Sequence, residues 1–394
     1  MSVISPPKYV VSVLLCLESH GFRAYLVGGC VRDCIMGRRP NDWDICTSAL
    51  PSEVMEVFHN SRPTGLKHGT VTVIEHGSSV EITTFRTDGV YLDHRRPENV
   101  RFVSDLTADL ERRDFTINAI ALPLSGIAFD PFGGMADIEN KLIRCVGDPD
   151  RRFNEDALRM LRAVRFSATL GFEIEEQTMA AIRKNAYLAK SLAAERVCTE
   201  VEKILLSKTP QKIEELIRSG LLSEYVYANK NVTDLSPIAL IPKNRFQRWA
   251  ALCVLLRLGG LIDSAEEFLL KLRLDSATVH NASRGCELAL SGIPQTRLEW
   301  KRLLAKNGTD CGKCTAAAAE VMDGENNIRQ LQSIISCGDC YSLKRLNISG
   351  DDLLELGFSG PKLGWALDTL LDYILEHPAE NVRPLLLERA RQLL

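Results

Sequence analysis

Two aspartates and a pair of glycines lie close together in GGCVRDCIMGRRPNDWDI, the stretch from Gly28 to Ile45. If the residues around Trp43 form a strand, Asp42 and Asp44 project from the same face, because successive side chains of a strand alternate. Two neighbouring carboxylates make a hard oxygen site, which suits Mg²⁺ carrying nucleotide phosphates better than a closed protein cage. The spacing therefore predicts metal-assisted phosphoryl chemistry, with Asp42 and Asp44 as the metal ligands.

Further groups for the same chemistry flank this pair. Gly28 and Gly29 end a predicted strand, where backbone N–H groups can approach phosphates without a Cβ in the way, and Arg32 follows about one helical turn later. Glu81, in VEITTFR, is available as a third carboxylate. Each part alone has a structural alternative, a glycine turn followed by a loop with capping aspartates. Their combination within one short stretch favours a phosphate and metal site.

A second group of candidates lies in NEDALRMLRAVRF, which predicts one long amphipathic helix from Asn154. On such a helix Asp156 and Arg159 are neighbours, so an acceptor stands beside a forked donor. This pair complements cytosine and adenine, which show an amino group next to a ring-nitrogen acceptor, and it mismatches uracil and guanine. The alternative is structural, since acidic residues favour a first helical turn and Glu155 with Arg159 is an ordinary i, i+4 pair.

The elements that must position these groups change in type along the chain. Before about residue 145 the pattern predicts a helix over residues 8–20, strands in RAYLVGG and DWDI, and a hairpin in GTVTVIEHGSSVEITTFR. Beyond it the periodicity is almost wholly helical, with further helices expected at about 176–205, 210–222, 245–258 and 363–376. The predicted fold class is an α+β N-terminal part followed by an all-α remainder.

Composition limits the kind of protein this is. The 394 residues are 45% hydrophobic, enough for several domains, and no apolar run reaches the ~18–20 residues of a membrane helix. The N-terminus shows no secretion signal, so we expect a cytoplasmic protein with reduced cysteines and no membrane partner. A net charge of −3 argues against extended charge-driven binding to nucleic acid. Any RNA contact would use local arginines.

One cysteine pattern stands apart. Cys311, Cys314, Cys337 and Cys340 form a C-x₂-C…C-x₂-C arrangement whose spacing can bind zinc. The sequence between the two pairs predicts a helix, so buried thiols without metal are the favoured interpretation.

Taken in order, YLVGGCVRD, NDWDI, KHGTVTV, VEITTFR, ERRDFTINAIA, DPFGG and RFNEDALRMLRAVRF resemble the motifs of class II tRNA nucleotidyltransferases, the family of CCA-adding enzymes and bacterial poly(A) polymerases. The resemblance runs from about residue 20 to 205 and continues more diffusely to the end. It implies a seahorse of four parts: a DNA polymerase β-like nucleotidyltransferase head over 1–145, a base-recognising helical neck over 146–210, a helical body over 211–300 and a tRNA-binding helical tail over 301–394.

The resemblance also implies residue roles. Asp42 and Asp44 would bind Mg²⁺ with Glu81 as the third carboxylate. The other nucleotide-binding positions implied are Gly29 and Arg32 at the triphosphate, Arg113 on the bound nucleotide, Asp156 and Arg159 as the amino-acid template for C and A, and Arg162 and Arg165 nearby. Asp130 of DPFGG would lie at a hinge between head and neck, and Glu195 and Arg196 in a helix that braces the neck.

The implied activity is template-independent addition of CCA to the 3′ end of tRNA from CTP and ATP, with the acceptor arm of tRNA as the partner and no obligate protein partner. Residues 86–102, RTDGVYLDHRRPENVRF, resemble the flexible loop that full CCA-adding enzymes use in changing from C to A. The alternatives are an A-adding or poly(A)-adding enzyme of the same family, or a non-catalytic RNA-binding protein. Retention of the three carboxylates weighs against the last.

Overall fold

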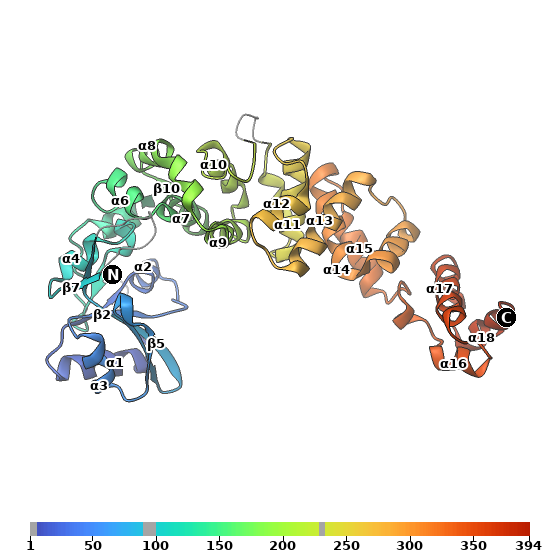
Figure 1. Ribbon diagram of the computed structural model, residues 1–394, viewed down its shortest axis with the longest axis horizontal. Coiled ribbons are helices and arrows are strands. Elements are labelled where there is room, and N and C mark those ends of the chain that lie inside the picture. Colours follow the sequence, from blue (N-terminus) through green and yellow to red (C-terminus); the bar gives the residue numbers. More distant parts are fainter. Residues whose placement is uncertain (1–5, 90–99, 228–232) are drawn as a thin grey trace. The chain divides into compact units, whose positions relative to one another are not determined.

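The computed structural model describes residues 6–89, 100–227 and 233–394 (Figure 1). Its chain forms two compact units. The first unit contains residues 1–204 and 215–224, and the second contains 205–214 and 225–394. Every strand among the described residues belongs to the first unit, whereas the second is helical. The predicted α+β N-terminal part with a helical remainder is therefore confirmed, while the finer division into head, neck, body and tail stays a prediction.

A six-stranded sheet with the strand order β3-β4-β5-β2-β1-β8 forms the centre of the N-terminal part. Its strands are β1 (Ala24–Val27), β2 (Asp44–Thr47), β3 (Ser61–Gly65), β4 (Thr70–Glu75), β5 (Ser78–Thr84) and β8 (Ala121–Leu122). The predicted hairpin is confirmed as β4 and β5, joined by His76 and Gly77 with φ of 48° and 76°. Two left-handed residues match the strand twist in a two-residue turn. β2 and β5 are parallel neighbours, which brings two distant segments together.

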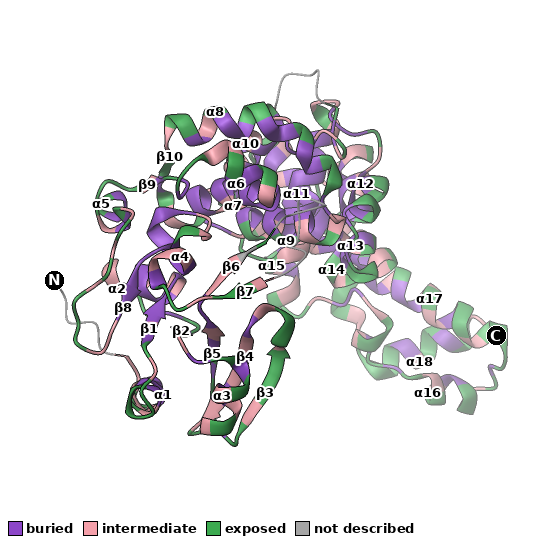
Figure 2. Ribbon diagram, turned by 60° about the vertical axis from the view of Figure 1, so that its left-hand side comes forward, coloured by how far each residue is buried: buried purple, intermediate pink, exposed green. Residues whose placement is uncertain are grey.

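Helices cover this sheet and complete its core (Figure 2). α1 (Lys8–Ser19) confirms the first predicted helix, and with α3 (Pro51–Val57) it packs against β4. A buried cluster joins Cys46 and Phe85 of the sheet region to Leu110 of α4 (Leu106–Glu111). The smaller elements of this part are α2 (Gly29–Ile35), η1 (Leu66–His68), η2 (Thr116–Asn118), α5 (Gly134–Glu139), the pair β6 (Arg86–Asp88) and β7 (Val100–Phe102), and the pair β9 (Leu142–Ile143) and β10 (Glu173–Ile174).

The prediction of one long helix from Asn154 is wrong. Two helices replace it, α6 (Pro149–Glu155) and α7 (Leu158–Phe166), followed by a π-helical segment, η3 (Ser167–Gly171). Asp156 between them is extended, with φ −139° and ψ 103°. Its carboxylate accepts a hydrogen bond from the backbone N–H of Leu158 at 3.1 Å. Such a local side-chain bond competes with the helical backbone, so it ends one helix and begins the next.

The remaining helices follow the predicted periodicity with interruptions. The range predicted as one helix over 176–205 contains α8 (Glu176–Asn185), η4 (Ala186–Ser191) and α9 (Ala194–Leu205), and the next contains η5 (Pro210–Lys212) and α10 (Ile213–Arg218). In the second unit lie η6 (Ser236–Leu240), α11 (Arg245–Leu258), α12 (Ala265–Lys271), α13 (Ser276–Ser291), α14 (Arg297–Asp323), α15 (Asn327–Ser336), η7 (Leu343–Arg345), α16 (Gly350–Glu355), α17 (Pro361–Glu376), η8 (Pro378–Glu380) and α18 (Arg383–Arg391).

Burial explains how the second unit is held together. α11 is buried on nearly all sides between α13 and α14, with Trp249 fully enclosed. α14 bends at Gly308, whose φ of 81° interrupts the helix. Trp300 of α14 belongs to a second apolar cluster that extends through α17 to α18. Among the described helices, none combines the length and the hydropathy that crossing a membrane requires.

Candidate active site

The predicted acidic residues lie where β2 begins. Asp44 is the first residue of β2 and is paired with Glu81 of β5 in parallel register, so both side chains leave the same face of the sheet. Asp42 lies in the bend before β2 rather than in the strand, which corrects the prediction that both aspartates belong to one strand. Trp43 between them is buried, whereas Asp42 and Glu81 are exposed. Burial, followed by the charges of Glu81 and Asp42, raises the pKa of Asp44.

This electrostatic environment fits a divalent cation. The charges of Glu81 and Asp42 act on Asp44 and are offset in part by Arg113, and a cation beside these carboxylates would offset them further. Among the described residues, no three His, Cys, Asp or Glu side chains lie close enough to bind a metal ion together. Carboxylate oxygens such as those of Asp42 and Asp44 are ligands that a divalent cation takes, and such an ion would need further ligands from outside the protein. Binding of Mg²⁺ by these two residues stays a prediction.

The predicted phosphate end lies against the acidic end. Gly28 has φ 79° and precedes α2, and a Cβ on it would lie 3.2 Å from Nη1 of Arg113 and 3.8 Å from Oδ2 of Asp44. Glycine suits this position, because its φ is positive and an added Cβ would crowd the guanidinium of Arg113. At Gly29 an added Cβ would lie 3.6 Å from Nη2 of Arg32. The structure thus brings Gly28, Gly29, Arg32, Arg113 and Asp44 into one place.

Arg113 is positioned by a residue that the sequence analysis missed. Asp109 of α4 is fully buried and accepts hydrogen bonds from Arg112 at 2.8 Å and from Arg113 at 3.3 Å. Burial alone would raise the pKa of Asp109, but the two arginines lower it below its ordinary value. Because Asp109 precedes them by three and four residues in TADLERRD, the i, i+3 and i, i+4 spacing was a signal that could have found it.

A hydrogen-bonded chain connects α2 to α7. Nη1 of Arg32 donates to Oδ1 of Asn118 at 2.7 Å, and Nδ2 of Asn118 donates to Asp114 at 3.0 Å. Arg162 donates to the other oxygen of Asp114 at 2.6 Å and 2.9 Å. Burial alone would raise the pKa of Asp114, but Arg162 and Asn118 hold it well below its ordinary value. Asn118 and Asp114 lie in the motif ERRDFTINAIA but were not predicted, because the arginines that bind them, Arg32 and Arg162, are distant in sequence.

The two candidate base-selecting residues are held by different partners. Arg159 is buried, and it donates to Glu155 at 3.1 Å and to the backbone carbonyl of Arg112 at 2.8 Å. Asp156 forms an ion pair with Arg196 of α9 at 3.2 Å. The Glu155–Arg159 pair of the structural alternative is therefore present, and it fixes the Arg159 guanidinium in place. Nη1 of Arg196 is buried, and it has no hydrogen-bond partner among the residues that the structure describes.

α9 contacts α7 as well as Asp156, which lies before it. Arg165 forms an ion pair with Glu200 of α9 at 2.8 Å, so Arg196 and Glu200 both link this helix to the candidate base-selecting segment. Asp130 accepts hydrogen bonds from the backbone N–H groups of Gly134 at 2.7 Å and Met135 at 2.8 Å, which caps α5. Its implied place at a hinge stays a prediction.

Comparisons with known proteins agree with this geometry. Residues 24–144 match the family described as the Poly A polymerase head domain, and residues 171–226 match a probable RNA and SrmB-binding site of polymerase A. A CCA-adding enzyme of Limosilactobacillus fermentum is 38% identical over 391 residues, which cover 97% of this chain and 96% of that protein. A CCA-adding enzyme of Geobacillus sp. (strain WCH70) is 37% identical, with 93% and 91% covered. This chain belongs to the CCA-adding enzyme family.

Solved structures of CCA-adding enzymes share the fold. The enzyme of Bacillus stearothermophilus in complex with CTP superimposes with a TM-score of 0.79 at 32% identity, covering 98% of this chain and 99% of that one. The Thermotoga maritima CCA-adding enzyme complexed with tRNA gives a TM-score of 0.71 at 22% identity, with 99% and 97% covered, and supports the fold alone. The resemblance drawn from the motifs is confirmed, and the chain is a tRNA nucleotidyltransferase.

The segment compared with the flexible loop of CCA-adding enzymes is described only at its ends. β6 and β7 pair as antiparallel strands, with Arg86 opposite Phe102. Residues 90–99 between them, with Arg95 and Arg96, lie outside the described residues. The part played by this segment in changing from C to A stays a prediction.

The four cysteines with zinc-like spacing do not form a metal site among the described residues. Cys311 and Cys314 are buried in α14, whereas Cys337 is exposed at the end of α15. Cys314 instead lies near Cys253 of α11, whose pKa is raised by burial and then by Cys286 and Cys314. Helical spacing turns the α14 thiols towards α11 and α13, which the cysteine count alone did not indicate.

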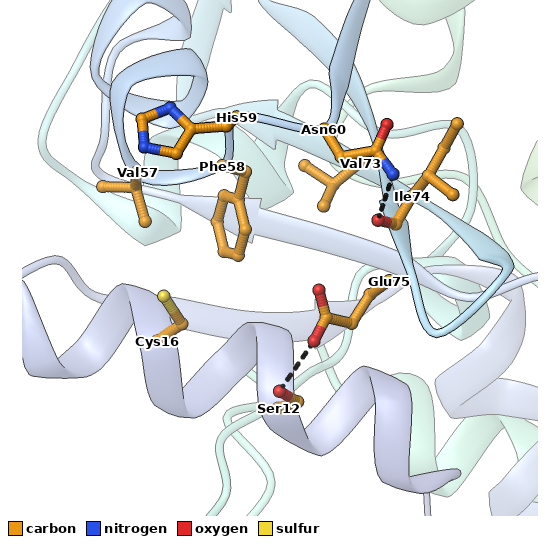
Figure 3. Close-up of a pocket in the computed structure, with 9 residues that line it drawn as sticks. All are labelled: Ser12, Cys16, Val57, Phe58, His59, Asn60, Val73, Ile74 and Glu75. Carbon is orange, nitrogen blue, oxygen red and sulfur yellow. Dashed lines mark hydrogen bonds between the residues drawn. The ribbon is translucent and has the colours of Figure 1, made fainter.

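A separate cavity of about 240 Å³ lies between α1, the end of α3 and β4 (Figure 3). Its one carboxylate, Glu75, accepts a hydrogen bond from Ser12 at 3.1 Å. Burial, with the charge of Glu75, raises the pKa of Cys16 in the same cavity. None of the predicted nucleotide-binding or metal-binding residues lines it, so it is not part of the candidate active site.

Proposed function

We propose that this protein adds CCA to the 3′ end of tRNA, using CTP and ATP without a nucleic-acid template and releasing pyrophosphate. The observation that carries the proposal is the convergence of Gly28, Asp44 and Arg113 in a chain that belongs to the CCA-adding enzyme family. The Bacillus stearothermophilus enzyme was solved in complex with CTP, which supports CTP as a substrate of this chain, and a tRNA complex is known for the Thermotoga maritima enzyme of the same fold. A cytoplasmic location and the absence of a membrane partner fit such a substrate.

In the proposed reaction the 3′-hydroxyl of tRNA attacks the α-phosphorus of the nucleotide, and the bond to pyrophosphate breaks. Arg32 and Arg113 would bind the triphosphate, because both guanidinium groups lie beside the glycines that admit a phosphate chain. Asp42 and Asp44, with Glu81 beside them, would hold Mg²⁺, which when bound supplies activation of the hydroxyl and neutralises charge on the leaving group. Positioning and charge compensation are the main needs of phosphoryl transfer.

Base choice would come from Asp156 and Arg159, with Arg162 and Arg165 as further nucleotide-binding groups. Each side chain of the pair is held from another element, Asp156 by Arg196 and Arg159 by Glu155. A fixed acceptor and a fixed donor can match the edges of C and A, and they leave unpaired polar groups against U and G. This rigidity supports a template made of amino acids rather than a surface that adapts to any base.

The test is an extension assay on a tRNA that lacks its CCA end, in which the products are separated at single-nucleotide resolution. With Mg²⁺ we expect CTP alone to give CC, and CTP with ATP to give CCA and then stop. Addition of A alone would favour an A-adding enzyme, and a long A tail would favour a poly(A) polymerase. No extension with or without metal, while tRNA still binds, would favour the non-catalytic RNA-binding alternative.

A further inference from the structure

One aromatic ring lies among three arginines of the candidate site. Phe166 is the last residue of α7, and the guanidinium carbons of Arg165, Arg32 and Arg162 lie 3.5, 5.2 and 5.2 Å from its ring centroid. All three are within the ~6 Å over which an aromatic ring attracts a cation. Arg32 comes from α2 and the phosphate end, whereas Arg162 and Arg165 come from α7 and the base end.

The ring itself is fixed. Phe166 is 5% exposed, and the fully buried Phe115 packs against it edge-on, with the centroids 5.7 Å apart and the planes at 83°. The π-helical segment begins at the next residue, and such segments are frequent at functional sites. Phe166 therefore has little freedom to turn away from the guanidinium groups.

Carboxylates do not explain this arrangement by themselves. Each arginine has its own acidic partner: Arg32 pairs with Asp33, Arg162 with Asp114 and Arg165 with Glu200. These partners lie on different elements, and the ring is the contact that the three arginines share. An aromatic face attracts a guanidinium without occupying its N–H donors, which stay available for a ligand. Leucine would fill similar space without that attraction.

We propose that Phe166 is a positioning residue of the nucleotide site, holding Arg32 at the phosphate end and Arg162 and Arg165 at the base end around one ring. The proposal rests on the proposed function, because it concerns binding of the same CTP and ATP. Phe166 acts through the orientation of the arginines. It therefore sets nucleotide affinity more than the rate of phosphoryl transfer.

The first test replaces Phe166 with phenylalanines that carry increasing numbers of fluorine atoms, in the full-length protein. Fluorine withdraws electron density from the ring face, so the attraction for cations falls while the shape of the ring is nearly kept. We expect the KM and the directly measured Kd for CTP to rise stepwise to about tenfold, which corresponds to about 1.4 kcal/mol. The kcat and the melting temperature should change little. A flat KM and Kd across the series would overturn the proposal.

The second test compares Phe166→Leu with a matched control, Phe172→Leu. Phe172 is 2% exposed, follows the same π-helical segment and makes no cation–π contact within the described part of the chain. Both variants should lower the melting temperature, but only Phe166→Leu should raise the Kd for CTP by about tenfold. Equal changes in Kd would assign Phe166 a packing role only. Failure of the wild-type protein to extend tRNA would refute the proposed function. If the wild type is active but the KM and Kd for CTP do not change across the fluorinated variants, only the role of Phe166 is refuted.

Discussion

Asp156 forms an ion pair with Arg196 of α9 at 3.2 Å. Arg159, three residues after Asp156, is paired with Glu155 instead. The acceptor and the donor proposed to choose the base are thus anchored independently. Anchoring matters because a flexible carboxylate or guanidinium could rotate to match another base, whereas a fixed one leaves a mismatched polar group unpaired.

We expect Arg159→Ala to lose selectivity for C and A. The Arg159 guanidinium is the donor that would be left unpaired against U or G, and alanine removes it. Discrimination against UTP and GTP should therefore fall by about tenfold or more. Single-turnover addition measured with each of the four nucleotides gives the ratio. Arg151→Ala is the matched control, because Arg151 pairs with the same Glu155 at 3.2 Å from a more exposed position. Nucleotide choice that stays unchanged in Arg159→Ala would refute the template role.

We expect Asp44→Asn to reduce nucleotide addition by at least about a hundredfold while tRNA binding is kept. The substitution preserves the size of the side chain but removes a negative charge from the place where Glu81 and Asp42 already concentrate it. Extension assays and tRNA-binding measurements separate the two effects. Glu75→Gln is the control, since that carboxylate lines the separate cavity and its bond from Ser12 can be kept. Normal extension by Asp44→Asn would end the proposed mechanism.

The sequence predicts those features of the fold and the site that depend on short-range patterns. Alternating residues on either side of His76 and Gly77 predicted the hairpin. The short spacing of Gly28, Gly29 and Arg32 predicted residues that the structure does bring together, while their binding of phosphate stays a prediction. The break at Asp156 was missed because one side-chain hydrogen bond overrides an otherwise helical period. Asn118 was missed for another reason, since its bond from Arg32, which is 86 residues away in the sequence, exists only once distant elements pack together.

The ion pair of Asp114 with Arg162 should make stability depend on acidic pH. The folded-state pKa of Asp114 lies below the ordinary value of about 3.9, so its stabilisation is fully present above that pH and is lost as the pH falls through the folded value. Asp114→Asn should lower the free energy of unfolding by about 2 kcal/mol at pH 7, and by progressively less below pH 4.

Urea unfolding of the wild type and of Asp114→Asn at pH 7, 4 and 3 measures this difference. Glu18→Gln, which removes an exposed carboxylate of α1, serves as the control for the change of charge. A gap between wild type and Asp114→Asn that is the same at pH 7 and pH 3 would contradict the prediction.

Close packing of α13 against α14 makes Gly285 intolerant of any side chain. A Cβ there would lie 2.4 Å from Cβ of Cys314 and 2.8 Å from its backbone carbonyl carbon, so the helices would have to separate. We expect Gly285→Ala to lower the free energy of unfolding by about 2 kcal/mol or more, although alanine favours a helix. Gly364→Ala in α17 is the matched control: nothing lies within 4 Å of its added Cβ, and it should stabilise by about 0.5–1 kcal/mol. The urea unfolding midpoints of both variants, compared with that of the wild type, measure these two changes. Cys314→Ala should not restore the stability of Gly285→Ala, because alanine keeps the Cβ and the backbone that obstruct the added side chain.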